Sequence, residues 1–140
     1  MLLSRARRDI SLFDTALSTA FDRPHRLDLL RTFLAADHVN RLRIVLHDAQ
    51  SIGRDCPRLC ALMRRYSEAV SVHQTTQAAR SAADPLIVVD ATHVLRRVHY
   101  THPRSVLITD DAAATRPLLE RFEQIHEASE PALSPTVLGL

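Results

Sequence analysis

The chain has 140 residues, of which 46% are hydrophobic and 24% charged, and this balance predicts one soluble globular domain. All 18 of its Lys+Arg residues are arginines, and it has 2 glycines and no tryptophan. Without lysine, the chain cannot form a lysine Schiff base or use a lysine nucleophile. With only Gly53 and Gly139, it has no glycine-rich loop to wrap the phosphates of a nucleotide, so Walker-type and dinucleotide-binding motifs are excluded.

The charge is distributed unevenly along the chain. Residues 1–65 hold 12 arginines and 7 acidic residues, whereas residues 66–140 hold 6 arginines and 9 acidic residues. The net charge is +2, so this asymmetry is mild. It predicts a solvated, arginine-rich surface rather than a nucleic-acid-binding tail.

Cysteine usage and the apolar runs indicate the compartment. Cys56 and Cys60 are four residues apart and would share one face of a helix, a geometry that rarely allows a disulfide. Their spacing is not that of a redox or zinc motif, and it favours a reduced interior. The amino-terminal stretch is charged from Arg5 onward, and no run approaches the roughly 20 apolar residues that span a bilayer. We therefore expect a cytoplasmic protein without a membrane segment.

The first half of the chain alternates predicted strands and helices. Asp22 and Asp55 each lie two residues before a proline, and we expect each to cap the helix that follows. The predicted elements are an edge strand at residues 10–13, an amphipathic helix at 23–37, a strand at 41–46, a loop at 49–54, a helix from Pro57 and a half-buried strand at 69–73.

The second half is richer in strands. Its predicted elements are a loop at residues 74–84, a buried strand at 86–89, a return strand at 94–99 that forms a hairpin, a strand at 105–109, a helix at 112–128 and an extended tail at 129–140. The order β-α-β-α-β-β-β-α predicts a single-domain α/β fold with a mixed, largely parallel sheet and helices packed on it.

Three segments of the second half resemble the end of one repeat of the phospholipase D superfamily. They are Leu-Ile-Val-Val-Asp-Ala-Thr-His-Val-Leu at 86–95, Arg-Ser-Val-Leu-Ile-Thr-Asp at 104–110 and Leu-Glu-Arg-Phe-Glu-Gln-Ile-His-Glu-Ala-Ser at 119–129. In that superfamily each half-domain carries His-x-Lys-x-x-x-x-Asp on a buried strand, followed by a Gly-Ser-x-Asn segment, a later strand and a closing helix. The chain also resembles small bacterial proteins of unknown function related to this fold. The resemblance implies that residues 1–140 form one phospholipase D-like half-domain.

The catalytic residues of that superfamily do not match. When the motif is aligned on Asp90, its histidine falls on Ala83, its lysine on Pro85 and its Gly-Ser-x-Asn segment on residues 97–100. The family histidine is the nucleophile and the lysine neutralises the phosphate, whereas alanine cannot attack phosphorus and proline donates no hydrogen bond. The resemblance therefore implies a non-catalytic interaction or scaffold module. Because active members place two half-domains around a two-fold axis, it also implies a homodimer or a protein partner.

A second interpretation is an enzyme with a rebuilt site. His47 and Asp48 follow one predicted strand, Asp90 follows another, and Asp110 and Asp111 follow a third. If these strands are parallel neighbours, the side chains converge where α/β proteins bind ligands, and His47, Asp48 and Asp90 could support a metal-assisted phosphoesterase with Arg97 holding phosphate. The alternative is that each aspartate caps the turn or helix that follows it.

A basic cluster lies on the predicted hairpin. It consists of Arg96, Arg97, His99 and Arg104, and it could bind an anion or, weakly, nucleic acid. Only Tyr100 interleaves with it, so a stacking platform for single strands is poorly supported. A solvated hairpin face is the alternative interpretation.

Three histidines, His93, His99 and His102, lie within ten residues and could bind a transition metal together with Asp90. No H-x-H or H-x-x-x-H pair supports such a site. We expect exposed histidines, and neither a metal nor a cofactor.

Overall fold

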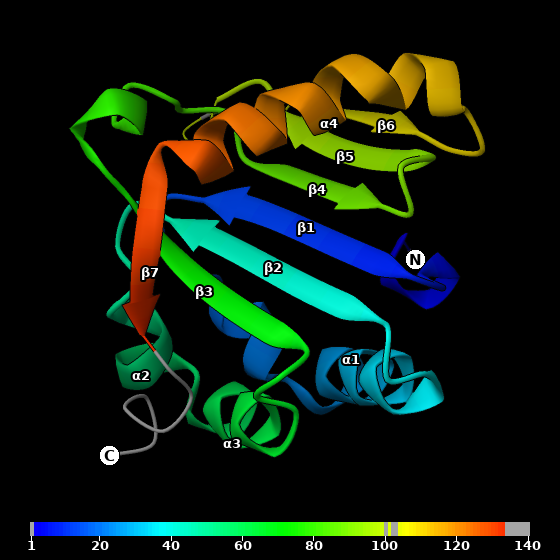
Figure 1. Ribbon diagram of the computed structural model, residues 1–140, viewed down its shortest axis with the longest axis vertical. Coiled ribbons are helices and arrows are strands. Elements are labelled where there is room, and N and C mark those ends of the chain that lie inside the picture. Colours follow the sequence, from blue (N-terminus) through cyan, green and yellow to red (C-terminus); the bar gives the residue numbers. More distant parts are fainter. Residues whose placement is uncertain (1, 100, 102–103, 134–140) are drawn as a thin grey trace.

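The computed structural model describes residues 2–99, 101 and 104–133 (Figure 1). The strands are β1 (Asp9–Asp14), β2 (Arg41–Leu46), β3 (Val70–Thr75), β4 (Leu86–Val89), β5 (His93–Arg97), β6 (Ser105–Ile108) and β7 (Ser129–Leu133). The helices are α1 (Pro24–Ala36), α2 (Ser51–Asp55), α3 (Pro57–Arg65) and α4 (Ala112–Glu127), with short 3-10 turns η1 (Leu2–Arg5), η2 (Thr19–Asp22) and η3 (Gln77–Ala79).

All seven strands form one mixed sheet in the order β6-β5-β4-β1-β2-β3-β7. The mixed α/β class is confirmed, but the expectation of a largely parallel sheet is wrong. Only β1–β2 and β2–β3 are parallel, and the other four neighbouring pairs are antiparallel. The reason is that parallel neighbours need a crossover connection, and only α1 and the α2–α3 pair provide one.

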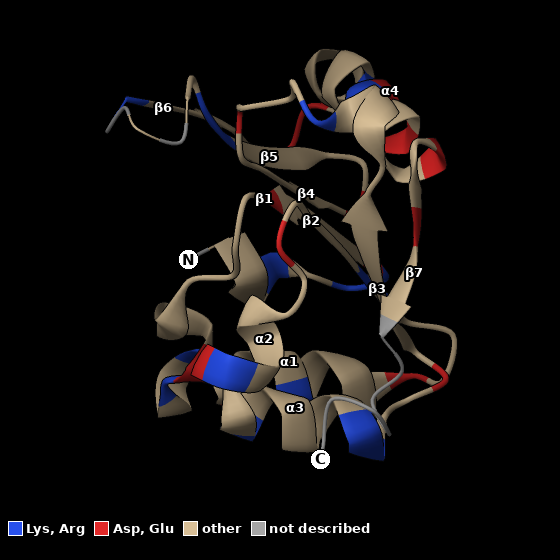
Figure 2. Cartoon of the chain, turned by 90° about the vertical axis from the view of Figure 1, so that its left-hand side faces the viewer, with Lys and Arg blue, Asp and Glu red and all other residues tan. Residues whose placement is uncertain are grey.

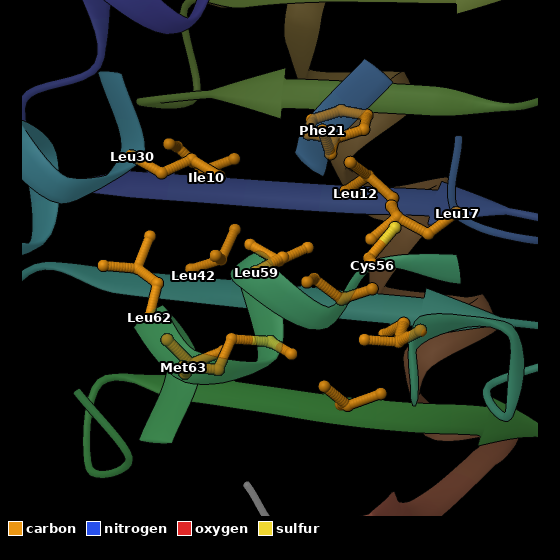
Figure 3. Close-up of a cluster of buried hydrophobic side chains, with 14 of the residues drawn as sticks. Ile10, Leu12, Leu17, Phe21, Leu30, Leu42, Cys56, Leu59, Leu62 and Met63 are labelled. Carbon is orange, nitrogen blue, oxygen red and sulfur yellow. The ribbon is translucent and has the colours of Figure 1, made fainter. Parts of the chain in front are cut away.

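The central strand is β1, which the sequence pattern predicted to lie at an edge. Four of its six residues are buried, because helices cover both faces of the sheet around it. Leu12 and Ile44 face the larger core, formed with α1–α3 (Figure 3), whereas Phe13 and Val45 face the smaller core, formed with α4. This alternation follows from the two-residue period of a strand.

The helix boundaries agree with the apolar spacing, but the predicted caps, Asp22 and Asp55, are wrong. The residue that caps α1 is Arg23 and the one that caps α3 is Cys56, and neither makes a side-chain capping hydrogen bond. Asp22 instead accepts a hydrogen bond from the backbone N–H of Leu59, at 2.8 Å, in the first turn of α3. It therefore stabilises the amino terminus of a helix that is distant in sequence. The predicted loop at 49–54 contains most of the short helix α2.

The hairpin of β4 and β5 is confirmed, with Val89 paired to His93. Its turn places Asp90 and Ala91 at φ 55° and 57°, and the N–H of Thr92 donates to the carbonyl of Val89 at 3.1 Å. Two consecutive positive φ angles are typical of a type I′ turn, which favours asparagine and glycine. Another interaction must therefore compensate the strain in this turn.

The carboxyl-terminal segment starts as an edge strand. Residues 129–133 form β7, antiparallel to β3, and the remainder of the predicted tail lies outside the described residues. Across the described part of the chain, we find no helix with both the length and the apolar character needed to cross a bilayer.

One face of the sheet bears the larger core, and helices cover only part of that face. Leu12 pairs with Ile87, Ile87 with Leu95, and Leu95 with Leu107, so these four side chains lie in a row across the sheet. Exposure rises from 3% at Leu12 to 62% at Leu107, because α1–α3 lie beside β1–β3 (Figure 1). We call Ile87, Leu95 and Leu107 the outer apolar stripe.

Both cysteines are buried and unpaired. Burial is the main reason that the pKa of the Cys56 thiol is raised to about 11, and it also raises the pKa of Cys60. The two thiols are therefore protonated at neutral pH and suit an interior rather than a reactive role.

Two histidines stack where β3, α4 and β7 meet. The rings of His73 and His126 are 4.3 Å apart between centroids. The Ser129 hydroxyl donates to the carbonyl of His126, so its oxygen accepts from Nδ1 of His73 at 3.0 Å. Burial lowers the pKa of both histidines, and the nearby charge of Arg43 lowers both further.

These lowered pKa values predict a pH dependence of stability. Between the usual pKa of histidine and the lower folded values, the unfolded chain binds protons that the folded chain does not. The free energy of unfolding should therefore be largest above about pH 6.5 and fall as the pH drops toward 5. The slope should stay well below about 1.4 kcal/mol per pH unit per histidine, because both rings are half-buried and solvent screens them.

Urea denaturation at a series of pH values measures this slope. His126→Gln should flatten it, whereas His25→Gln, on the exposed start of α1, should leave it unchanged. An equal slope in wild type and His126→Gln would contradict the assignment.

Candidate anion site at the edge of the sheet

The positions aligned with the motif histidine and lysine, Ala83 and Pro85, lie at one edge of the sheet. There the carboxyl ends of β1, β2, β3 and β5 meet the amino end of β4, since β4 runs antiparallel to β1 and β5. We call this side of the sheet, along which strands begin or end, the Asp84 edge, because Asp84 stands between Ala83 and Pro85, just before β4. The opposite edge, where β4 ends, is called the Asp90 edge.

Asp84 is a buried carboxylate held by two arginines. Only 5% of the residue is exposed. Arg121, from α4, donates from Nε to Oδ2 at 2.8 Å and from Nη2 to Oδ1, and Arg96, from β5, donates from Nε to Oδ2 at 3.0 Å. Burial alone would raise the pKa of Asp84, but the hydrogen bonds from Arg121 and Arg96 outweigh it and hold this pKa below its usual value. Asp84 therefore remains charged at neutral pH and forms ion pairs with both arginines.

Phosphate groups are bound by arginine side chains in the same way as the Asp84 carboxylate is. A guanidinium fork binds a carboxylate and a phosphate with similar geometry. At the Asp84 edge the protein's own carboxylate is bound by two guanidinium groups of the kind that bind an oxyanion. Arg96, predicted to bind an anion, is thereby paired within the chain.

The other residues of the predicted basic cluster lie around the turn that joins β5 to β6. Arg97 is half-buried at the end of β5. His99 Nδ1 lies 2.7 Å from the hydroxyl of Thr101, and Arg104 is exposed, its carbonyl accepting from the N–H of Val98 at 3.1 Å. These residues share one end of the hairpin with Arg96, whereas Tyr100 lies outside the described residues.

His47 also lies at the Asp84 edge, with both ring nitrogens hydrogen-bonded. Nε2 is 2.6 Å from the carbonyl of Ala82, and Nδ1 is 2.5 Å from the hydroxyl of Thr75. The carbonyl can only accept, so Nε2 donates to it, and Nδ1 is hydrogen-bonded to the Thr75 hydroxyl. With Phe13 packed against it edge to face, the ring is fixed between β1, β3 and the segment before β4. This arrangement suits a structural residue better than a nucleophile or base, because neither nitrogen is free.

Asp14, at the end of β1, was not singled out from the sequence. Burial raises its pKa, while the N–H of Thr15, at 2.7 Å, and the charges of Arg97 and His47 offset part of this rise. Arg97 at the end of the hairpin and His47 therefore both act electrostatically on Asp14 at this edge.

The proposed phosphoesterase residues are not brought together. His47 and Asp48 follow β2 at one edge, whereas Asp90 follows β4 at the other, because β4 is not parallel to β2. Asp48 lies 3.7 Å from Arg54 across an exposed ion pair. Among the residues that the structure describes, no cluster of three or more His, Cys, Asp or Glu could hold a metal ion.

Asp90 has a clear structural contact at its own edge. Its carboxylate accepts hydrogen bonds from the backbone N–H groups of Arg7, Arg8 and Asp9 at 2.8, 2.7 and 2.9 Å. These bonds fasten the start of β1 to the turn after β4, and they compensate the strain at Asp90.

The Asp90 edge also contains Asp110, which pairs with Arg5 at 3.2 Å, and His93. Nδ1 of His93 accepts from the N–H of Asp110 at 3.0 Å, and only 6% of the residue is exposed, so the expectation of an exposed histidine is wrong here. Asp111 caps α4 through the N–H of Ala114, as the capping alternative predicts. His99 lies at the other end of β5 from His93, and His102 lies outside the described residues.

Several residues that form ion pairs around the site were not identified from the sequence. Arg121 and Asp84 are 37 positions apart, and Arg43 forms a two-pronged ion pair with Glu123, 80 positions away. The available signal was an aspartate directly before the most apolar strand, where a buried charge requires a partner. Nothing in the sequence indicates which arginine that partner is.

The sheet order, the two cores and the closing helix α4 define a phospholipase D-like fold, and comparisons with solved structures agree. A phospholipase D family member, Nuc from Salmonella typhimurium, is 16% identical with a TM-score of 0.64, and the match covers 94% of this chain and 86% of that one. NucT from Helicobacter pylori is 12% identical with a TM-score of 0.55, over 93% and 86% of the two chains. TrmBL2, an archaeal chromatin protein described with a novel mode of DNA binding, is 17% identical with a TM-score of 0.60. That match covers 94% of this chain but 48% of TrmBL2.

The chain belongs to the family described as a domain of unknown function, DUF7931, whose model matches residues 1–134. No protein with a curated description matches it in sequence. At these identities, the solved structures establish the fold and nothing further.

Proposed function

We propose that this chain is a non-catalytic phospholipase D-like module that works by interaction, as a homodimer or beside a protein partner. The observation that carries the proposal is the Asp84 cluster. Between Ala83 and Pro85, where the family motif has its nucleophile and its phosphate-binding lysine, a buried carboxylate occupies Arg96 and Arg121. Ala83 and Pro85 lack the nucleophile and the cation of the motif, and Asp84 accepts hydrogen bonds from both guanidinium groups, which supports a role without catalysis.

The outer apolar stripe supports an interaction role. Ile87, Leu95 and Leu107 form an apolar row that ends on β6, an edge strand without charge or proline. Such an edge and such a face favour association with another protein surface. A second copy is a natural occupant, because an apolar patch can meet itself across a two-fold axis.

Light scattering at micromolar concentration tests the homodimer. We expect a dimer in the wild type and a monomer in Leu107→Ser. Val106→Ser is the matched control, because Val106 lies next to Leu107 on β6 but faces the α4 side, paired with Arg96. A monomeric wild type, or equal effects of the two variants, would rule out a dimer through the stripe.

Catalysis is tested separately with bis(p-nitrophenyl) phosphate. We expect hydrolysis at the background rate in both the wild type and His47→Gln. Wild-type hydrolysis that disappears in His47→Gln would overturn the non-catalytic assignment, whatever the oligomeric state.

A second candidate function is weak binding of nucleic acid through the hairpin. The description of TrmBL2 as a DNA-binding chromatin protein favours it. Arg104, which is exposed, would contribute to this binding, whereas Arg96 is already paired with Asp84.

A further inference from the structure

Helices α1 and α3 carry an excess of positive charge. Together they hold five arginines and one acidic residue: Arg26, Arg31, Arg58, Arg64 and Arg65, with Asp28. On the opposite face of the sheet, α4 holds three glutamates and two arginines, and one of those arginines is bonded to Asp84. Figure 2 shows this contrast, with blue segments on α1 and α3 and both red and blue segments on α4. The two faces of the molecule therefore differ in the charge that they present.

The charge on α1 and α3 is concentrated along a groove between them. This groove has a volume of about 360 Å³, and its charged lining residues are Arg31, Arg58 and Arg65, above Leu27, Ala61 and Leu62. All three arginines are exposed. Arg58 and Arg65 are seven positions apart on one helix, so they lie on the same face about 10 Å apart along its axis.

These guanidinium groups are accessible to a ligand. Within the described ranges 2–99, 101 and 104–133, the structure gives the Arg58 side chain no hydrogen bond or ion pair. Arg31 pairs with Asp28 at 2.6 Å, but half of the Arg31 side chain and 70% of the Asp28 side chain are exposed. An exposed pair of this kind contributes little free energy and exchanges readily for another anion. Arg65 lies over the Tyr66 ring, with its guanidinium carbon 5.9 Å from the ring centroid.

We infer that the groove between α1 and α3 binds the phosphate backbone of double-stranded nucleic acid. A row of arginines along an open groove matches a repeating anion and carries no base-specific information. Single strands need aromatic side chains to stack on, and the groove has none in its lining. An anionic membrane would favour exposed apolar side chains beside the charges, but the large ones described are Val98, Val106 and Leu107, at the other end of the sheet. The inference concerns a different surface from the hairpin and holds for a monomer or a dimer.

Fluorescence anisotropy with a labelled DNA duplex of about 20 base pairs and mixed sequence tests it, at about 50 to 200 mM salt. We expect the wild type to bind with a slope of log K against log salt of about −2 to −3, as three phosphate contacts predict. Arg58→Ala should reduce the magnitude of this slope by about 1 and weaken binding about tenfold at the lowest salt. Arg116→Ala makes the same charge change at an exposed position of α4 and should leave the slope unchanged.

A second matched pair tests the opposite sign. Asp28→Asn should tighten binding, because Asp28 pairs with the groove residue Arg31, whereas Glu120→Gln on α4 should not. The four substituted residues, Arg58, Arg116, Asp28 and Glu120, are all exposed. Thermal melting of each variant checks that it folds.

Several outcomes would overturn the inference. They are no wild-type binding at the lowest salt, equal effects of Arg58→Ala and Arg116→Ala, and loss of binding in Arg104→Ala but not in Arg58→Ala, which would place the contact on the hairpin. Binding to phosphatidylserine vesicles without binding to the duplex would assign the groove to a membrane surface instead.

Discussion

Asp84→Ala should lower the free energy of unfolding by about 2–4 kcal/mol, because it leaves two guanidinium groups without their buried partner. The loss should stay below the upper range for buried pairs, since 39% of each arginine side chain is exposed and solvent shares the charge. Urea denaturation at neutral pH measures it. Asp28→Ala breaks an exposed pair and should cost less than about 0.5 kcal/mol. Equal losses in the two variants would show that the Asp84 cluster is not a buried ion pair.

The same variant should gain an anion site. With the carboxylate removed, Arg96 and Arg121 can hold an oxyanion in its place. Inorganic phosphate should therefore raise the melting temperature of Asp84→Ala more than that of the wild type or of Asp28→Ala, because a ligand stabilises the state that binds it. Equal stabilisation of all three proteins would mean that Asp84 does not occupy an anion position.

Asp90→Ala should lower the free energy of unfolding by about 3 kcal/mol. It removes the charged acceptor of three backbone N–H groups and leaves alanine at a positive φ. Asp90→Asn should lose about half as much, because asparagine tolerates the turn and keeps one oxygen. Denaturation measures both losses, and hydrogen exchange should accelerate at Arg7, Arg8 and Asp9.

Asp110→Asn is the control at the same edge. Asp110 is also at a positive φ, but its side chain is 78% exposed and pairs only weakly with Arg5, so the change should be within about 0.5 kcal/mol. A neutral Asp90→Ala variant would contradict the structural role. If such a variant also lost a phosphodiesterase activity, Asp90 would be assigned to catalysis instead.

Much of the fold follows from local patterns in the sequence. The apolar spacing at Leu27, Leu30 and Leu34 predicts α1, and the apolar run 86–89 followed by 94–99 predicts the β4–β5 hairpin. These predictions succeed because periodicity is a property of neighbouring residues. The position of β1 at the centre of the sheet, and the capping of α3 by Asp22, depend on which segments meet in space, so local patterns do not contain them.

The sequence likewise predicts some features of the candidate site and not others. The mismatch of Ala83 and Pro85 with the family motif is visible in the sequence and predicts the loss of its chemistry. The expected convergence of His47 with Asp90 fails because it required parallel strands, and β4 runs antiparallel to β1. Arg96, Arg97 and Arg104 do lie at one end of the hairpin, but the sequence did not indicate that Asp84 neutralises one of them.

The absence of lysine and the scarcity of glycine determined, without any structure, which phosphate-binding devices this protein cannot have. Those are statements about residue type, and the sequence is sufficient for them. Which arginines remain open to an anion was decided only by the tertiary structure. It brings Arg121 to within hydrogen-bonding distance of Asp84 but leaves Arg58 exposed beside a groove. The physical reason is that neutralisation depends on the distance and the solvent between two charges, and both are set by packing rather than by order along the chain.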